Sequence, residues 1–254
     1  MKDIQKIPVI ILAGGLGTRL MPVIYDRPKV LAPVGDKTVL DRVMENLIRQ
    51  NFKNFILSVG YLQNMIRDHI AERHWPENIS ILFSEEKEPL GTGGAIKKAL
   101  DASDHDLAVI LNGDTLFPVN YQILINFHIS KNAEISIGLR EIENASASGT
   151  VLSDNSNRIL KFQEKNNIKQ PGVINGGVYV FQKNVLNRLN FPEKFSIEKD
   201  FFEKFIDGVN AYGLAFEEYF IDIGTPENYK KANDDFQWKA LPVKAEFFIL
   251  KNKP

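Results

Sequence analysis

The sequence predicts an α/β fold, with a Rossmann-like, mixed and mostly parallel central sheet flanked by helices and a small antiparallel side lobe. A β-branched apolar run, Val9–Leu12, leads directly into a loop with three glycines in four residues. From there to about residue 130, strand-like and helix-like segments alternate, which is the pattern of a parallel sheet with crossover helices. After residue 149, two strand patterns separated by a short polar turn indicate an antiparallel hairpin.

The elements of the first half follow from hydrophobic periodicity. Thr38 with Asp41 three residues later is typical of a capped helix start. Apolar residues recur behind it at helical spacing: Leu40, Val43, Met44, Leu47 and Ile48. In order, we expect a strand over 7–13, a helix from residue 38, a strand over 55–59, a helix over 61–72, a strand over 79–83, a helix that ends near residue 100, a strand over 107–111 and a helix over 121–130.

The second half is expected to supply the side lobe and the last strands. Strands are predicted over 135–139, over the hairpin arms 149–152 and 158–162, and over 178–181 after a loop at 172–177. Ser196 opens a helix whose Phe201, Phe202 and Phe205 we assign to the core. A strand ends near Asp222, and Pro226 opens the last helix. Residues 237–254 form a C-terminal extension, in which an apolar run at 247–250 would have to dock on the body or on a second subunit of a homo-oligomer.

Composition excludes several classes of protein. The chain has 254 residues, 44% of them hydrophobic, which is enough for a substantial core. Its 31 basic residues balance 32 acidic ones, so no general positive field favours nucleic acid or an anionic membrane as partner. Cysteine is absent, which excludes disulfides and thiolate metal sites and agrees with a cytoplasmic location. The first apolar run is too short to span a membrane, and no signal-peptide cleavage pattern follows it.

The loop after the first strand has the make-up of a phosphate-binding site. Its glycines allow backbone N–H groups to converge on anionic oxygens, while Arg19 and Lys29 supply positive charge. A dinucleotide-binding motif requires a glycine where Leu20 stands, and a Walker A loop requires a closing Gly-Lys-Ser/Thr, so both motifs are excluded. The remaining alternative is an ordinary strand-to-helix turn with a surface arginine and lysine.

Two later segments place carboxylates beside predicted strand ends. The segment 84–95 combines Glu86 with three glycines at a helix start, which suits a ligand with N–H donors, although a solvated acidic turn has the same composition. The strand over 107–111 ends in Asn112-Gly113-Asp114, where ligands of open α/β sheets bind. Asp114 suits Mg²⁺; the alternative is a turn in which it caps a helix. The four histidines share no metal-ligand spacing.

The glycine loop Gly14-Gly15-Leu16-Gly17-Thr18-Arg19-Leu20, followed by Pro28-Lys29, resembles the signature of the sugar-1-phosphate nucleotidyltransferases. These enzymes join a nucleoside triphosphate to a sugar 1-phosphate and release pyrophosphate. Four later motifs resemble the same family and occur in its order: Asn112-Gly113-Asp114, Glu164-Lys165, Asn175-Gly176-Gly177 and Ile221-Asp222-Ile223-Gly224. The resemblance covers roughly residues 7 to 232.

The resemblance implies a single nucleotidyltransferase domain over 1–236, with a nucleotide half over about 1–117 and a sugar-phosphate half over about 118–236. It implies that Arg19, Lys29 and Asp114 are catalytic and that Asp114 and Asp222 hold Mg²⁺. The nucleotide-binding residues it implies are Leu12, Ala13, Gly14, Gly15, Gly17, Thr18, Glu86, Gly91 and Thr92. The sugar-phosphate-binding residues it implies are Asn112, Glu164, Lys165, Asn175 and Gly176.

Within that family, the segments 88–96, 195–202 and 221–227 most resemble the D-glycero-D-manno-heptose 1-phosphate guanylyltransferases. The resemblance implies GTP and the heptose phosphate as substrates and GDP-heptose, for surface polysaccharide, as product. Guanine presents adjacent N–H donors at N1 and N2, which suit the carboxylate of Glu86, whereas uracil and thymine present one. The alternatives are a mannose-1-phosphate guanylyltransferase, a uridylyl- or thymidylyltransferase for another sugar, and an inactive regulatory subunit that binds nucleotide sugars.

Overall fold

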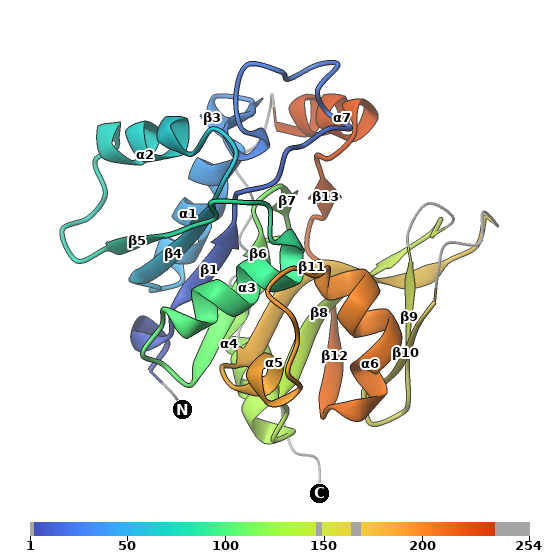
Figure 1. The fold of residues 1–254 in the computed structure, drawn as a ribbon. Helices are drawn as coiled ribbons and strands as arrows, with labels where there is room; N and C mark the ends of the chain where they lie inside the picture. Colours follow the sequence, from blue (N-terminus) through green and yellow to red (C-terminus); the bar gives the residue numbers. More distant parts are fainter. Residues whose placement is uncertain (1–2, 146–148, 164–168, 237–254) are drawn as a thin grey trace, which may run out of the picture.

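A nine-stranded sheet runs through the molecule and carries helices on both faces (Figure 1). The computed structural model describes residues 3–145, 149–163 and 169–236 of the chain. The strand order is β10-β9-β11-β6-β1-β4-β5, and β8 and β12 extend the sheet from β11. Within these residues, no helix combines the length and the apolar character needed to cross a membrane.

The first half of the chain builds the parallel part of the sheet. The strand β1 (Val9–Leu12) lies between β4 (Asn54–Val59) and β6 (Leu107–Asn112), parallel to both, and β5 (Ser80–Glu85) is parallel to β4. The helices of this half are α1 (Val39–Arg49), α2 (Gln63–Glu72), α3 (Gly91–Asp101) and α4 (Tyr121–Ser130). The predicted alternation is therefore confirmed. Thr38 and Asp41 form the expected reciprocal cap at the start of α1.

The second half adds mainly antiparallel pairings. The long strand β11 (Gly172–Gln182) is antiparallel to β6 and to β8 (Ile135–Ile142), and β12 (Ala211–Phe216) is parallel to β8. The predicted hairpin is confirmed as β9 (Thr150–Ser153) and β10 (Ile159–Gln163). It is joined to the main sheet where Ile174 pairs with Thr150.

In this half, one predicted loop is wrong and one strand was not predicted. The segment 172–177 is not a loop, because β11 already begins at Gly172 and accommodates the glycines in a bulge between Asn175 and Val178. The strand β12 is unforeseen because alanine and glycine are common in it, and both are poor strand formers.

Short elements complete the fold. Two small antiparallel pairings are β2 (Pro33–Val34) with β3 (Lys37–Thr38), and β7 (Thr115–Leu116) with β13 (Ile221–Asp222). Helical pieces are η1 (Ile4–Lys6), η2 (Lys29–Leu31), α5 (Val185–Arg188), the π-helical η3 (Ile197–Phe202), α6 (Glu203–Phe205), η4 (Ile206–Gly208) and α7 (Pro226–Phe236). As predicted, Pro226 opens α7, and the Ser196 hydroxyl caps η3 by accepting the Lys199 N–H.

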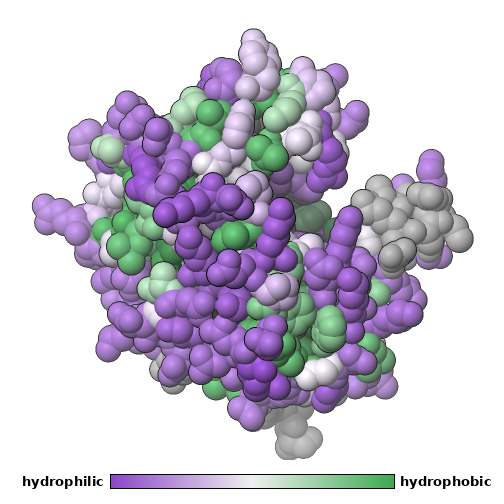
Figure 2. Space-filling model, in the orientation of Figure 1, coloured by the Kyte–Doolittle hydropathy of each residue, from purple (hydrophilic) through white to green (hydrophobic). Residues whose placement is uncertain are grey.

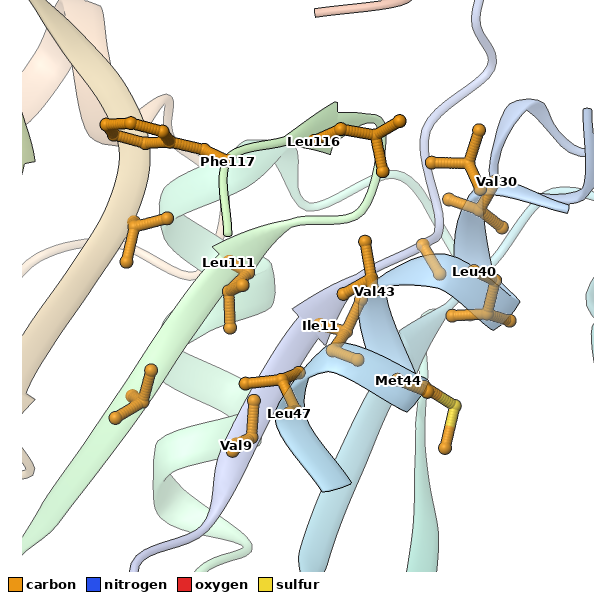
Figure 3. Packing of buried hydrophobic residues seen from close by; sticks show 14 of the residues in the cluster. Val9, Ile11, Val30, Leu40, Val43, Met44, Leu47, Leu111, Leu116 and Phe117 are labelled. Atoms are coloured by element: carbon orange, nitrogen blue, oxygen red, sulfur yellow. The ribbon is translucent and has the colours of Figure 1, made fainter. Parts of the chain in front are cut away.

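Alternate side chains of the central strands belong to two hydrophobic cores, one on each face of the sheet. Val9 and Ile11 pack with α1 and α4, while Ile10 packs with α3, α5 and η3. Figure 3 shows the first of these cores, with the apolar stripe of α1 turned toward Val9 and Ile11. Phe201 and Phe202 are buried as predicted, whereas Phe205 is 49% exposed and does not belong to the core. The extension 237–254 lies outside the described residues.

Candidate active site

Four charged side chains meet beyond the carboxyl ends of β1 and β6. Arg19 and Lys29 come from the segment after β1, Asp114 follows β6, and Asp222 ends β13. Asp222 is opposite Thr115 in the antiparallel pairing of β13 with β7, which lie side by side in Figure 1. The Ile223 N–H also donates to the Asp114 carbonyl oxygen over 3.0 Å. This pairing brings together two aspartates that are far apart in the sequence.

Lys29 forms an ion pair with Asp114, with their side chains only 18% and 19% exposed. The Thr115 hydroxyl donates to the other carboxylate oxygen of Asp114 over 3.3 Å. Gly17, with a φ of +62°, brings the loop against the lysine: a Cβ at Gly17 would lie 3.3 Å from Lys29 Cβ. The glycine loop and the lysine are thus held together, with the ammonium group beside the aspartates.

The surroundings of Asp222 disfavour the ionised form of its carboxyl group. Burial and the charge of Asp114 raise the pKa of its carboxyl, against the opposing effects of the Gly224 N–H, Lys29 and Arg19. The Gly224 N–H donates to Asp222 Oδ1 over 2.7 Å, and a Cβ at Gly224 would lie 3.0 Å from Arg19 Nη2. Two neighbouring carboxylates that repel each other provide the oxygen ligands that Mg²⁺ prefers. The donor set therefore fits a divalent cation.

This pair of aspartates leaves most of a cation's coordination shell to other ligands. The described residues contain no cluster of three or more histidine, cysteine, aspartate or glutamate side chains able to hold a metal. Mg²⁺ is commonly bound by one or two carboxylates together with substrate phosphates and water. Two carboxylates are thus the protein ligands that the described part of this site offers to a cation.

The glycine loop lies against Glu86. A Cβ at Gly14 would lie 2.7 Å from Glu86 Oε1 and 3.1 Å from the backbone nitrogen of Gly60, so only glycine fits there. Glu86 is half-buried, and its carboxylate accepts the Ser58 hydroxyl over 3.2 Å and the Leu90 N–H over 3.0 Å. These bonds fix the carboxylate beside the loop and leave further lone pairs for a ligand. Sequence reasoning missed Ser58, which carries no motif.

The adjacent strands β6 and β11 contribute further polar side chains near Asp114. Asn112 Oδ1 is buried without a hydrogen-bond partner among the described residues, and its Nδ2 lies beside Gly177, whose φ is +71°. Asn175 accepts the Gly177 N–H over 2.9 Å and donates to the Tyr179 hydroxyl over 2.8 Å. An unpaired acceptor at the end of a central strand is suited to a ligand hydroxyl.

Packing explains one glycine that the sequence analysis assigned to a ligand. A Cβ at Gly176 would lie 2.4 Å from the ring of Phe117, so this position requires glycine with or without a sugar nearby. Its role in sugar binding stays a prediction. Glu164 and Lys165 lie outside the described residues.

The segment around Ser196, which we assigned only to the core, also contributes polar groups. The Thr92 hydroxyl donates to Glu198 Oε2 over 2.7 Å and accepts the Ile197 N–H over 2.9 Å. Burial, followed by the charge of Glu198, raises the pKa of Tyr179, and Asp114 acts in the same direction. Glu198 and Tyr179 therefore belong to the surroundings of the site. The available signal was Glu198, a carboxylate two residues after the cap residue Ser196.

The loop region remains open to solvent. Leu16, Met21, Val23 and Tyr25 are exposed hydrophobic residues of the segment that links Gly15 to Lys29. Apolar groups are interspersed with polar ones at the upper end of the molecule in Figure 2, where Figure 1 places this segment and α7. These apolar side chains are therefore available for contacts at the surface.

Comparison with known proteins identifies related sequences and structures. A family model described as "Nucleotidyl transferase" matches residues 8–238. The chain is 42% identical over 228 residues to the D-glycero-alpha-D-manno-heptose 1-phosphate guanylyltransferase of Aneurinibacillus thermoaerophilus, which covers 90% of this chain and 97% of that protein. It is 40% identical to the enzyme of that name from Campylobacter jejuni, over 87% of this chain and 96% of that protein.

Among solved structures, the fold is similar to that of HddC from Yersinia pseudotuberculosis complexed with GMP-PN. The TM-score is 0.80 and the sequence identity 35%, over 91% of this chain and 99% of that chain.

Proposed function

This chain belongs to the nucleotidyl transferase family, and we propose that it transfers a guanylyl group from GTP to D-glycero-α-D-manno-heptose 1-phosphate. The products would be GDP-heptose and pyrophosphate. The observation that carries the proposal is the meeting of Arg19, Lys29, Asp114 and Asp222 at the carboxyl edge of the sheet. The two relatives at 40% and 42% identity, both named for this reaction, support the choice of substrates.

The reaction requires no nucleophile from the protein. A phosphate oxygen of the sugar 1-phosphate attacks the α-phosphorus of GTP in line. A bond forms between this oxygen and the α-phosphorus, and the bond between the α-phosphorus and the bridging oxygen of the leaving pyrophosphate breaks. Catalysis then consists of positioning the two substrates and stabilising the charge on the transferring group. Arg19 and the backbone N–H groups of the glycine loop would hold the β- and γ-phosphates, and Lys29 the α-phosphate.

Asp114 and Asp222 would hold Mg²⁺, which neutralises phosphate charge and orients the reacting oxygens when bound. Their mutual repulsion, seen in the raised pKa of Asp222, would be relieved by that cation. Lys29, already paired with Asp114, would then be free to turn toward the α-phosphate. The compartment we propose is the cytoplasm, in line with the absence of cysteine.

We further propose that Glu86 reads guanine and that Asn112 and Asn175 face the sugar phosphate. The position of Glu86 against Gly14 and the two donors that fix its carboxylate support this role. A carboxylate can accept from N1–H and from N2–H₂ of guanine together. The unpaired Asn112 Oδ1 supports a contact with a sugar hydroxyl.

Pyrophosphate release tests the proposal directly. Purified protein with Mg²⁺ is assayed with GTP, ATP, CTP, UTP and TTP against the 1-phosphates of the heptose, mannose, glucose and N-acetylglucosamine. We expect turnover with GTP and the heptose phosphate, lost in Asp114→Ala. Preference for mannose 1-phosphate would change the sugar, faster turnover with UTP or TTP would refute guanine recognition, and no turnover with any pair would refute the transferase function.

A second assay addresses Glu86 specifically. Hypoxanthine keeps the N1–H of guanine but lacks the N2 amino group, so ITP removes one of the two proposed hydrogen bonds. The kcat/KM of the wild-type protein should be at least tenfold higher for GTP than for ITP, and Glu86→Gln should reduce this ratio. An unchanged GTP/ITP ratio in Glu86→Gln would assign Glu86 to the structure of the loop alone.

A further inference from the structure

The start of α3 and the beginning of η3 are joined tightly, although they belong to the nucleotide half and the sugar-phosphate half. The Phe195 N–H donates to the Leu90 carbonyl over 3.0 Å, and the N–H groups of Gly93 and Gly94 donate to the Phe195 carbonyl over 3.0 and 3.3 Å. A Cβ at Gly94 would lie 2.0 Å from the carbonyl oxygen of Glu193. The glycines of this segment therefore allow two backbones to touch.

Side chains extend this junction toward the site. The Thr92 hydroxyl gives its proton to Glu198 Oε2 and accepts the Ile197 N–H, and the Ser196 hydroxyl donates to the same Oε2 over 2.9 Å. One oxygen of Glu198 is thus held by two donors. No described residue is hydrogen-bonded to the other oxygen, Oε1. A half-buried carboxylate held on one side only has an acceptor to offer to a ligand.

This junction extends from Glu86, the proposed contact of the guanine base, to Tyr179 and Asn175 on β11. At one end, the Leu90 N–H donates to Glu86 Oε2 over 3.0 Å. At the other end, Glu198 acts on the buried Tyr179, whose hydroxyl is hydrogen-bonded to Asn175 and which also feels the charge of Asp114. The α3 start is therefore hydrogen-bonded to both carboxylates, to Glu86 through the Leu90 N–H and to Glu198 through the Thr92 hydroxyl.

We propose that Thr92 is a positioning residue that holds Glu198 with Oε1 toward the hydroxyl groups of the sugar phosphate and couples the two substrates. The inference rests on the proposed function and assigns Thr92 a role beyond the nucleotide contact expected from the sequence. Binding of the sugar phosphate to Glu198 fixes the α3 start and, through Leu90, the carboxylate of Glu86. Coupling of this kind is reciprocal, so bound nucleotide raises affinity for the sugar phosphate by the same factor.

Thr92→Val tests the proposal, because valine keeps the shape of threonine but cannot hydrogen-bond. We expect KM for the heptose phosphate to rise tenfold or more, the range typical of a lost hydrogen bond to a charged group, with a smaller change in KM for GTP. Thr92→Ser keeps the hydroxyl and should restore both values.

Calorimetric titration measures the coupling itself. The affinity of a non-hydrolysable GTP analogue is determined with and without saturating heptose phosphate. We expect a gain in affinity of at least threefold in the wild-type protein and in Thr92→Ser, and none in Thr92→Val.

Asn120→Ala is the matched control, because it removes a comparable side-chain cap, the bond from the Ile123 N–H at the start of α4. A purely structural effect would lower the melting temperature in both variants and leave KM and the affinity ratio unchanged. Should Thr92→Val fail to fold, Glu198→Gln must show the same rise in the sugar-phosphate KM.

The affinity ratio is the affinity for the GTP analogue with heptose phosphate divided by that without it. The inference would be overturned if Thr92→Val kept the wild-type KM and affinity ratio, or if this ratio were one in the wild-type protein. Either result would leave the transferase function intact. Absence of turnover in the wild-type protein would instead refute the function, and the inference with it.

Discussion

Gly93→Ala should destabilise the protein through a single contact. A Cβ at Gly93 would lie 2.2 Å from Cε2 and 2.4 Å from Cδ2 of the Phe195 ring, whereas real Cβ atoms essentially never approach closer than 3.0 Å. The ring cannot move away easily, because Phe195 is only 5% exposed and packs on Phe191 with ring centroids 4.7 Å apart. Relief of the clash therefore requires α3 or the Phe195 segment to shift.

The size of the effect follows from two opposing terms. Overpacking a well-packed core costs about 1–3 kcal/mol, while alanine is favoured over glycine in a helix by about 1 kcal/mol. Because the contact at 2.2 Å is far too short, we take the upper part of that range, about 2–3 kcal/mol, which leaves a net loss of about 1–2 kcal/mol in the free energy of unfolding. For a protein of this size, that corresponds to a melting temperature lower by roughly 2–8 °C.

Urea denaturation followed by circular dichroism measures this loss. Gly208→Ala is the control, because a Cβ there meets nothing within 4 Å, and its stability should change by less than about 0.5 kcal/mol. In a Phe195→Leu background the clash with the ring is removed, so Gly93→Ala should cost at least about 1 kcal/mol less. An equal cost in both backgrounds would refute the packing argument. Lost activity with unchanged stability would instead assign Gly93 to ligand binding.

Three further predictions concern charge. Lys29→Met should lower kcat/KM for pyrophosphate release by about 10²–10³-fold, the effect of removing one preorganised donor from a charged transition state; a loss below tenfold would remove Lys29 from the chemistry. Asp222→Asn should raise the Mg²⁺ concentration needed for half-maximal activity by tenfold or more, measured by titrating Mg²⁺ after EDTA treatment, because one of two carboxylates is lost; an unchanged Mg²⁺ requirement would place the ion elsewhere. Burial would raise the pKa of Asp41, but hydrogen bonds from His69 and Thr38 and the charges of His69 and Arg73 lower it to about 2. A lowered pKa stabilises the folded protein at pH values above the ordinary pKa near 4, so about 2 kcal/mol of the free energy of unfolding should be lost as pH falls from about 4 to 2. Urea denaturation of Asp41→Asn should lack this pH dependence. The same pH dependence in Asp41→Asn as in the wild-type protein would contradict the assignment to Asp41.

The parallel half of the fold could be predicted because its periodicity is strong. The strand Val9–Leu12 is uniformly apolar, and α1 shows a reciprocal cap followed by a regular apolar stripe. The second half was harder because its strands are held by partners distant in sequence. The strand β12 contains alanine and glycine, and the bulge hides the strand character of 172–177. Tertiary pairing overrides local preference in both places.

The charged centre could be predicted from motifs, but not from periodicity. Asp222 reaches Asp114 through a pairing of two-residue strands, β7 and β13, and strands this short leave no pattern in a sequence. Glu198 was missed for a related reason. Its partner Thr92 lies on another element, and the apolar neighbours Phe201 and Phe202 made the segment look like core alone.

Hydrogen bonds between α7 and the β2–β3 hairpin help to fix the positions of Lys29 and Asp222. Lys29 leads into the β2–β3 hairpin, and Asp222 leads into α7. The Tyr229 hydroxyl donates to the Pro33 carbonyl over 2.7 Å, and the Gly35 N–H donates to Asn233 Oδ1 over 3.1 Å. These bonds join α7 to the hairpin and so fix the segments that carry Lys29 and Asp222 relative to each other. Electrostatic catalysis depends on such preorganisation, because groups that need not move when charge develops stabilise it most.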